Sequence, residues 1–336
     1  LLDPEVRRVA DLPGYSKAVA GSGGSIAGLY VNPSSVQRFF STDIAGADGA
    51  DPLANAQGAA AFLAVAGNRL TATGRIVGPE GEDASLFTKR DRGVVEFIPG
   101  KSEVALHVAL SAPEVDAALE KFLTGNKWGW KPYVGQKRVA LKELHLPADT
   151  ELHQLWDGEI GLFVSELSPN PASTLHKSVA FLGLEDLGQV KKGVSAIAKL
   201  VGEKHMTERK IGKAAAWRIT HAGMTMGLMV HRGRLWFGGD LAILAAIEER
   251  KDSRGNYGPR VEEMMRGMRE ANGGAMYADL AAIVEHLPEV LSHEQQEKLE
   301  PFSTLLAKLD YLTWRGDVEG NVTTGKLTLA VDSASL

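Results

Sequence analysis

The chain has 336 residues and a formal net charge of −5 at pH 7, and 44% of its residues are hydrophobic. These values indicate a globular protein with a substantial core, and the acidic balance argues against a nucleic-acid partner. The absence of cysteine excludes disulfides, thiol catalysis and cysteine-based zinc sites, and favours a location outside the reducing cytoplasm. No apolar run is long enough for a transmembrane segment and no signal peptide is present; because the chain starts at Leu1, we expect a processed or truncated form.

The first predicted module lies between residues 8 and 78. It contains a helix, a strand that ends at Val31, and a second helix with Asn32 as its N-cap. Two alternating apolar segments then flank Gly67-Asn68, which is typical of a β-hairpin.

Residues 101–258 are predicted to form the central part of the chain. The last strands form a meander, which is typical of antiparallel sheet. Apolar patterning predicts strands at 103–110, 158–165, 177–183, 214–221, 224–230 and 234–238, and helices at 113–123, 187–201 and 240–250.

The corner Gly238-Gly239-Asp240 joins a predicted strand to a predicted helix. A glycine-rich turn before a helix can hold a phosphate, but this one lacks the glycine spacing and the lysine of known nucleotide-binding motifs. We therefore predict a simple corner, in which Asp240 caps the helix.

The last module, 260–332, repeats the order of the first. Tyr277 and Asp279 correspond to Tyr30 and Asn32, a second hairpin turns at Gly320-Asn321, and TGKL at 324–327 matches TGRI at 73–76. The predicted fold is α+β, with duplicated strand–helix–hairpin modules that form twisted antiparallel sheets with helices packed on one face. Residues 1–100 are then the C-terminal part of a first repeat copy, and 101–336 are a second, more complete copy.

The stretch GNKWGWKPYVGQKR at 125–138 is predicted to be a loop. Aromatic side chains among cations suit a partner protein, a sugar or an anionic lipid headgroup. Alternatively, the two tryptophans cover an edge of the core. The candidate ligand- or partner-binding residues are Lys127, Trp128, Trp130, Lys131 and Tyr133.

The strand MTMGLMV at 224–230 is apolar on both faces, which favours a buried central strand. The alternative is the wall of an apolar cavity, where flexible methionine suits a lipid chain. The candidate cavity residues are Met224, Met226, Met229 and Trp236.

Titratable side chains gather at 144–161. A histidine–carboxylate cluster can perform acid–base chemistry, but a polar surface loop is decorated in the same way, and we predict the loop. The nine histidines show no metal-ligand spacing and no G-x-S-x-G motif is present, so we predict no metal, no cofactor and no catalytic residue. The cluster comprises His145, Asp149, Glu151, His153, Asp157 and Glu159.

The segments LWFGGDLAILAAIEE and GGAMYADLAAIVEHLP, with the closing hairpin VEGNVTTGKLTLAVD, resemble uncharacterised bacterial cell-envelope proteins of the lipoprotein type that carry a domain of unknown function. The resemblance covers most of the chain and implies an extracytoplasmic location, periplasmic or outer-membrane associated. It implies no functional residues. The meanders also resemble those of periplasmic lipoprotein carriers, which have a half-barrel sheet with helices on its concave side. The duplicated modules do not fit that class of protein.

Three functions are consistent with these observations. We predict a non-enzymatic binding or assembly protein of the cell envelope, whose partner is an envelope protein or a second copy of the chain. One alternative is a periplasmic carrier or sensor of a lipid or other apolar ligand. The other is a hydrolase that uses the 144–161 cluster.

Overall fold

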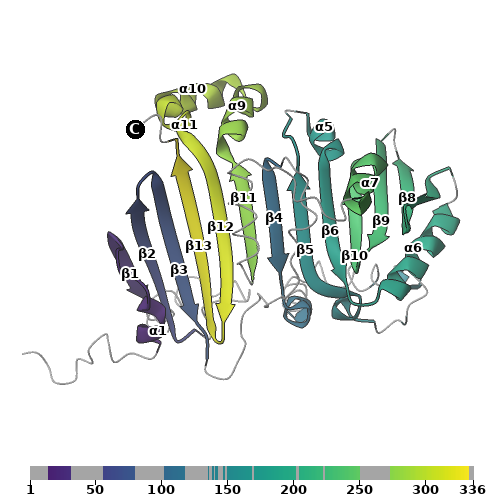
Figure 1. Cartoon of the computed structure of the whole chain (residues 1–336), viewed down its shortest axis with the longest axis horizontal. Helices are drawn as coiled ribbons and strands as arrows, with labels where there is room; N and C mark the ends of the chain where they lie inside the picture. Colours follow the sequence, from purple (N-terminus) through teal and green to yellow (C-terminus); the bar gives the residue numbers. More distant parts are fainter. Residues whose placement is uncertain are drawn as a thin grey trace, which may run out of the picture.

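The structure, a computed structural model, is dominated by one antiparallel sheet of thirteen strands (Figure 1). It describes residues 14–31, 56–79, 102–117, 135, 138–139, 141–142, 147, 150–168, 170–201, 204–221, 224–249 and 273–332. The strands are β1 (Ala27–Val31), β2 (Gly58–Ala66), β3 (Arg69–Val77), β4 (Val104–Ala109), β5 (Trp156–Val164), β6 (Ser178–Leu184), β7 (Met206–Ile211), β8 (Ala214–His221), β9 (Met224–His231), β10 (Arg234–Gly238), β11 (Gly274–Asp279), β12 (Leu309–Glu319) and β13 (Val322–Val331). Their order across the sheet is β1-β2-β3-β13-β12-β11-β4-β5-β6-β10-β9-β8-β7.

The described helices are short and lie beside the sheet or at its ends. They include α1 (Tyr15–Val19), α5 (Pro171–His176), α6 (Leu187–Val201), α7 (Leu241–Glu249), α9 (Leu280–Val290), α10 (His293–Leu299) and α11 (Ser303–Leu306), with 3-10 turns η3 (Leu152–Gln154) and η4 (Glu300–Phe302). Residues 112–117, at the start of the predicted helix 113–123, are also helical. Among the described residues, no helix combines the length and the apolar composition needed to cross a membrane.

The six strands predicted in the central part are confirmed to within a few residues, but β7, which extends the meander beside β8, was not predicted. The β2–β3 and β12–β13 hairpins turn at Gly67 and Gly320, each with a φ of 57°. Glycine is favoured there because other residues rarely adopt positive φ. The turn between β9 and β10 places Arg232 at a φ of 49° and Gly233 at 75°.

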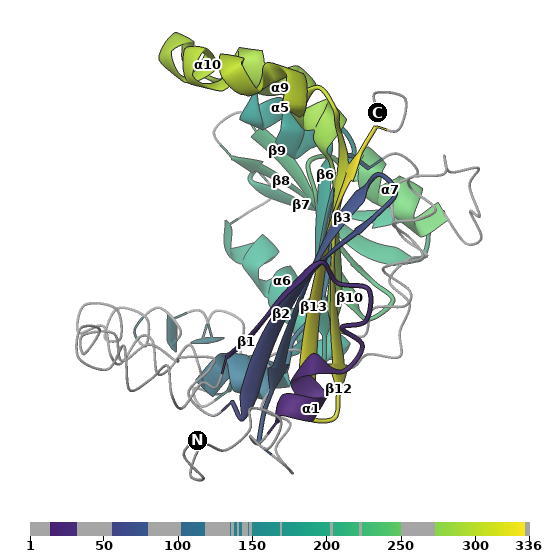
Figure 2. The same ribbon diagram turned by 90° about the vertical axis from the view of Figure 1, so that its left-hand side faces the viewer.

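The predicted arrangement of sheets and helices is wrong. The strands form one continuous sheet, not several, and the helices do not pack on one face. Helix α6 packs through Val194 on one face, against Trp217 and Leu228, whereas α7 packs through Leu244 and Ile247 on the opposite face. Figure 2 shows the two helices on opposite sides of the sheet. The strands between them are apolar on both faces, so both faces have to be covered to be removed from water.

The corner before α7 is a structural turn. The Asp240 carboxylate accepts a hydrogen bond from the Ala242 N–H at 2.6 Å, which satisfies one unpaired donor of the helix N-terminus. A Cβ on Gly239 would lie 2.2 Å from the Leu175 carbonyl oxygen. Glycine is therefore required by the close approach of α5.

The two hairpins that resemble each other in sequence lie side by side. Strand β3 pairs with β13, and Gly74 of TGRI lies directly opposite Gly325 of TGKL. The two hairpins thus meet in an antiparallel arrangement centred on this glycine pair. The division of the chain into 1–100 and 101–336 stays a prediction.

Candidate functional site: an apolar sheet face

One face of the sheet is apolar across β1 to β5. Directly paired residues of antiparallel strands share a face, so the strand register defines rows that run across the sheet. The first row comprises Val65, Leu70, Leu329, Leu312, Ala278, Val104 and Val164. The second row comprises Ala27, Leu63, Ala72, Leu327, Trp314, Met276, Leu106 and Leu162. The third row comprises Leu29, Ala61, Gly74, Gly325, Gly316, Gly274, Val108 and Ile160. No side chain in these rows is charged or carries an amide. We call this surface the open face.

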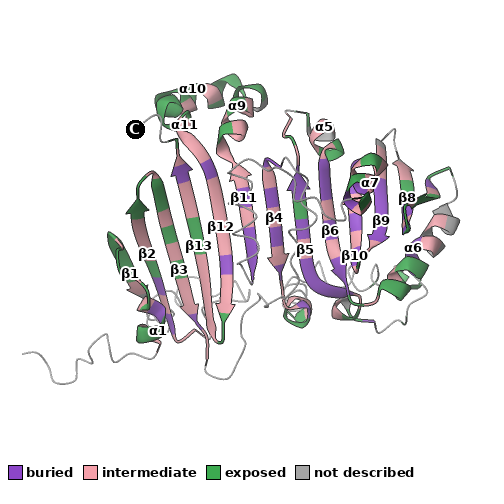
Figure 3. Cartoon of the chain, in the orientation of Figure 1, coloured by how far each residue is buried: buried purple, intermediate pink, exposed green. Residues whose placement is uncertain are grey.

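Large aliphatic side chains of the open face are exposed. The exposed fraction is 63% for Leu29, 54% for Val65, 40% for Leu327 and 39% for Leu70. Figure 3 shows that strands β1, β2, β3 and β13 carry exposed and half-buried positions, whereas β6 and β10 are largely buried. Contiguous apolar surface of this kind is rare on soluble monomers and marks an interaction site.

The reverse face of β3 and β13 has the opposite character. It presents Thr71, Thr73 and Arg75 from β3 and Lys326 and Thr328 from β13, as the register and the alternation of side chains require. The hydroxyl oxygens of Thr71 and Thr328 lie 3.2 Å apart. Part of this face is covered by α1, whose Ala18 packs with Ala60 and Val77. Strands β3 and β13 are therefore amphipathic, with their open side apolar, whereas β2 is apolar on both faces.

The third row of the open face has almost no side chains in its centre. Trp314 lies over half of it: a Cβ on Gly316 would be 2.8 Å from its Cη2, one on Gly274 3.2 Å from its Cζ3, and one on Gly325 3.5 Å from its Nε1. At Gly74, by contrast, a Cβ would meet no atom within 4 Å. The row is thus filled by the indole at one end and is open at Gly74.

A helical arm made of α9, α10, η4 and α11 extends from one end of the sheet, toward the side on which α6 lies (Figure 2). It contains a groove of about 410 Å³ and exposes Phe302 and Leu305 at 55% and 58%. Asp279 caps α9 by accepting from the Ala282 N–H at 3.0 Å, as predicted from its sequence position. The groove is lined by Val284, Leu287, Pro288, Leu291, His293, Gln296, Glu297, Leu299, Glu300, Ser303 and Leu306.

Gln296 ties the two main helices of the arm together. Its side-chain Nε2 donates to the carbonyl oxygens of Pro288 at 2.7 Å and Leu291 at 2.9 Å, at the end of α9. We expect Gln296→Ala to cost about 1 kcal/mol of local stability, because these carbonyls lose a donor. Hydrogen exchange of residues 288–300 should accelerate, while the exposed control Thr304→Ala should leave it unchanged. Unaltered exchange in Gln296→Ala would show that these bonds do not hold the arm.

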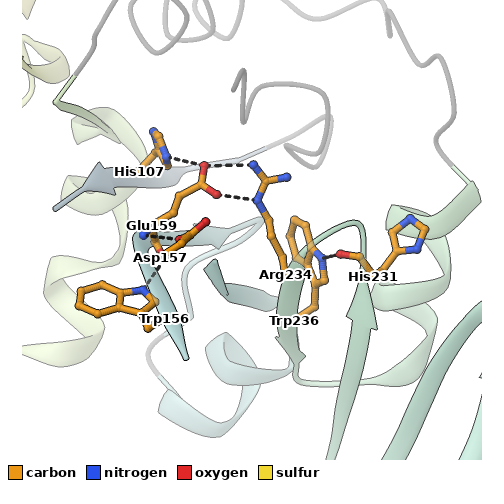
Figure 4. Close-up of polar contacts among 7 residues, drawn as sticks. All are labelled: His107, Trp156, Asp157, Glu159, His231, Arg234 and Trp236. Carbon is orange, nitrogen blue, oxygen red and sulfur yellow. Dashed lines mark hydrogen bonds and ion pairs between the residues drawn. The ribbon is translucent and has the colours of Figure 1, made fainter. Parts of the chain in front are cut away.

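A closed polar network lies on the reverse face, within the core of the sheet (Figure 4). The Glu159 carboxylate accepts two hydrogen bonds from Arg234, at 2.9 Å from Nε and 3.0 Å from Nη2, and one from His107 Nε2 at 3.1 Å. The three residues come from β5, β10 and β4, and all are buried. The Arg234 guanidinium also lies over the Phe181 ring, 5.0 Å from its centroid.

Burial raises the pKa of Glu159, but hydrogen bonds from His107 and Arg234 and the charge of Arg234 lower it by more. The net pKa is below the usual 4.5, so the carboxylate stays ionised and paired. Glycines provide the space for this network: a Cβ on Gly161 would lie 1.9 Å from the Phe181 ring. A carboxylate that is buried and accepts three hydrogen bonds from neighbouring side chains is a structural group.

The remaining sequence-predicted candidates are dispersed. Residues Lys127, Trp128, Trp130, Lys131 and Tyr133 lie outside the described residues. Met229 and Trp236 are paired and fully buried in the core under α7. Met226 occupies a register position on the other face, opposite Ile219, and the side chain of Met224 is outside what the structure describes. The structure therefore does not bring this set together around one cavity.

The 144–161 cluster is also divided. Glu159 belongs to the closed network, and the Asp157 carboxylate accepts from the Glu159 N–H at 2.9 Å. His153 Nδ1 lies 2.8 Å from Asp116 Oδ2, which also accepts from the His153 backbone N–H at 2.9 Å. His145 and Asp149 fall outside the described residues. In the described ranges, no three His, Asp or Glu side chains are grouped so that they could hold a metal ion.

Sequence reasoning missed the open face. Its signal was present as the two TG dipeptides of β3 and β13 and as glycines 274 and 316 in β11 and β12. These glycines are far apart in sequence, and only the register of four strands places them in one row.

Comparisons with known proteins add little. No family model matches the chain, and no curated protein matches it. A solved structure described as crystal form I of TP0453 is similar at 10% sequence identity and a TM-score of 0.33, covering 76% of this chain and 97% of that chain. A score this low carries no argument about fold or function. The resemblance to envelope proteins of the lipoprotein type therefore stays a prediction.

Proposed function

We propose that the protein binds an apolar ligand, the acyl chain of a lipid, on its open face, and that it performs no chemistry on it. The observation that carries this proposal is the group of exposed aliphatic side chains on β1, β2, β3 and β13, which lie in three neighbouring rows of the open face. Transfer of such surface from water to a hydrocarbon environment is favourable by about 25 cal/mol per Å².

The composition of the open face favours an acyl chain over a protein partner. A protein–protein interface carries about one hydrogen bond per 100–200 Å². The first two rows of the open face present aliphatic side chains, one methionine and one tryptophan, and none of these offers a carboxylate, amide or hydroxyl. An acyl chain needs no hydrogen bonds, whereas a protein partner would have to leave its own polar groups unpaired there.

The buried polar groups support a binding role without catalysis. The Glu159 network is closed by mutual pairing, and His153 is held by Asp116 beside η3. An extracytoplasmic location belongs to this proposal and is supported by the cysteine-free sequence. Binding or assembly with an envelope protein, or with a second copy of the chain, is the competing function.

Native mass spectrometry of the purified protein, followed by titration with the fluorescent fatty acid cis-parinaric acid, tests the proposal. We expect a lipid adduct or saturable binding, and Leu327→Glu should weaken binding by about tenfold or more, since it places a charge on an apolar surface. Lys326→Glu is the matched control, because Lys326 is the exposed neighbour on the reverse face. It should bind as the unmodified chain does.

The competing function predicts a different result. A chain that binds no parinaric acid but self-associates in analytical ultracentrifugation, with self-association abolished by Leu327→Glu, would replace the lipid by a second copy of the chain. Equal effects of Leu327→Glu and Lys326→Glu on parinaric acid binding would remove the open face as the site.

A further inference from the structure

We infer that the acyl chain lies along the third row of the open face, across the strands, in a furrow that is floored by Ala61 and Gly74 and closed above Gly325 by the indole of Trp314. This inference rests on the proposed function and specifies the course of the ligand. Leu29 lies at one end of the furrow, and Trp314 lies at the other.

Gly74 has no structural reason to be glycine. Its φ is not in the left-handed region, and a Cβ there would meet no atom within 4 Å. A glycine inside a strand weakens the strand by about 0.5–1 kcal/mol relative to alanine, and often marks a place where a ligand approaches the backbone closely. Gly325, directly opposite, also has ordinary φ, and its nearest neighbour is the indole of Trp314. The space above Gly74 is therefore available to a ligand, whereas the indole of Trp314 lies on Gly325.

The neighbouring rows form the walls of the furrow. On one side lie Leu63, Ala72 and Leu327, and on the other lie Ala59 and Ile76, two residues further along β2 and β3. Ala61, Gly74 and Gly325 stand on three adjacent strands. From Leu29 on β1 to the indole edge above Gly325 on β13 the furrow crosses three strand spacings, which at about 4.8 Å each is about 14 Å, the length of about a dozen carbon atoms in an extended chain.

Trp314 closes the furrow toward β12. Its ring lies on the glycines of β13, β12 and β11, and its Nε1 edge is the part above Gly325. An acyl chain that enters from the β1 side therefore crosses Gly74 and meets the edge of the indole above Gly325. Leu29, at 63% exposure, stands at the entry side.

Filling the furrow at Gly74 tests this course. Gly74→Leu should weaken cis-parinaric acid binding by about tenfold, because the leucine occupies the volume of several methylene groups of the ligand. The fold should be retained, because space is open above Gly74. Thr73→Leu, on the same strand and the reverse face, is the control and should change binding by less than about twofold.

Quenching by a brominated fatty acid provides a second measurement. Bromine quenches a tryptophan that it contacts, so the ligand should quench the fluorescence of the unmodified chain more than that of Trp314→Phe. The failures are distinguishable: if the unmodified chain does not bind, the proposed function fails. If it binds and Gly74→Leu binds equally well, or if Trp314→Phe is quenched to the same extent, the course along the glycine row is wrong.

Discussion

Replacing Glu159 by alanine should lower the free energy of unfolding by about 3–5 kcal/mol, because it breaks a buried ion pair and removes the carboxylate that accepts two hydrogen bonds from Arg234. Arg234 loses both bonds to the carboxylate and His107 loses its partner, in a place where water cannot replace them. Urea denaturation followed by tryptophan fluorescence measures the loss. Glu208→Ala, at an exposed position of β7, should change stability by less than about 0.5 kcal/mol. A loss below about 1 kcal/mol in Glu159→Ala would mean that water compensates the buried cation.

The same network predicts the acid sensitivity of the fold. The pKa of Glu159 is lower in the folded chain than the usual 4.5 of an unfolded one. The unfolded state therefore takes up a proton first as the pH falls, so the stabilisation is fully present above pH 4.5 and is lost as the pH falls through the folded pKa. The difference in unfolding free energy between the unmodified chain and Glu159→Gln should shrink over this range. A difference independent of pH down to the folded pKa would contradict the assignment.

Truncating Trp236 to alanine is the second substitution with a large expected effect. Trp236 is fully buried and packs on Phe181 with ring centroids 4.8 Å apart, opposite Met229. Removing such a side chain from a filled core costs about 3–5 kcal/mol. Ligand binding at the open face should be unchanged under conditions where the variant is folded, because Trp236 lies on the reverse face.

Trp314→Ala is the informative comparison for Trp236→Ala. Trp314 is half-buried on its glycine floor, so its removal should cost less, about 1–2 kcal/mol, but should weaken binding of the acyl chain. Thermal unfolding and parinaric acid titration of both variants separate the two roles. If Trp236→Ala were stable but unable to bind ligand, the methionine strand would line the cavity and the open face would not be the site.

Local patterns were sufficient for the elements. The glycines at 67 and 320 mark hairpin turns because positive φ is cheap only for glycine, and Asp240 and Asp279 mark helix starts because a carboxylate at the N-cap satisfies free N–H groups. The six predicted strands of the central part follow from runs of apolar residues, whereas β7 (MTERKI) is largely polar and was not predicted. Each of these signals depends on neighbours within a few residues.

The way the elements pack together could not be predicted from such local signals. The apolar stripes on α6 and α7 indicate that each helix packs on the sheet, but they do not indicate on which face. The prediction that all helices pack on the same face was therefore wrong. The His107–Glu159–Arg234 network joins residues up to 127 positions apart, and its pairing follows from the order of β4, β5, β6 and β10. The sequence showed the titratable residues without their partners.

For the open face, too, some features could be predicted from the sequence and others depend on the tertiary structure. By itself, the sequence determined that β3 and β13 carry similar TG-containing segments and that both alternate between apolar and polar residues. Only the tertiary structure decided that Gly74 lies opposite Gly325, that Trp314 covers the neighbouring glycines, and that the aliphatic rows remain exposed. The physical reason is that alternation sets which side chains share a face within a strand, whereas register between distant strands is set by the packing of the whole sheet.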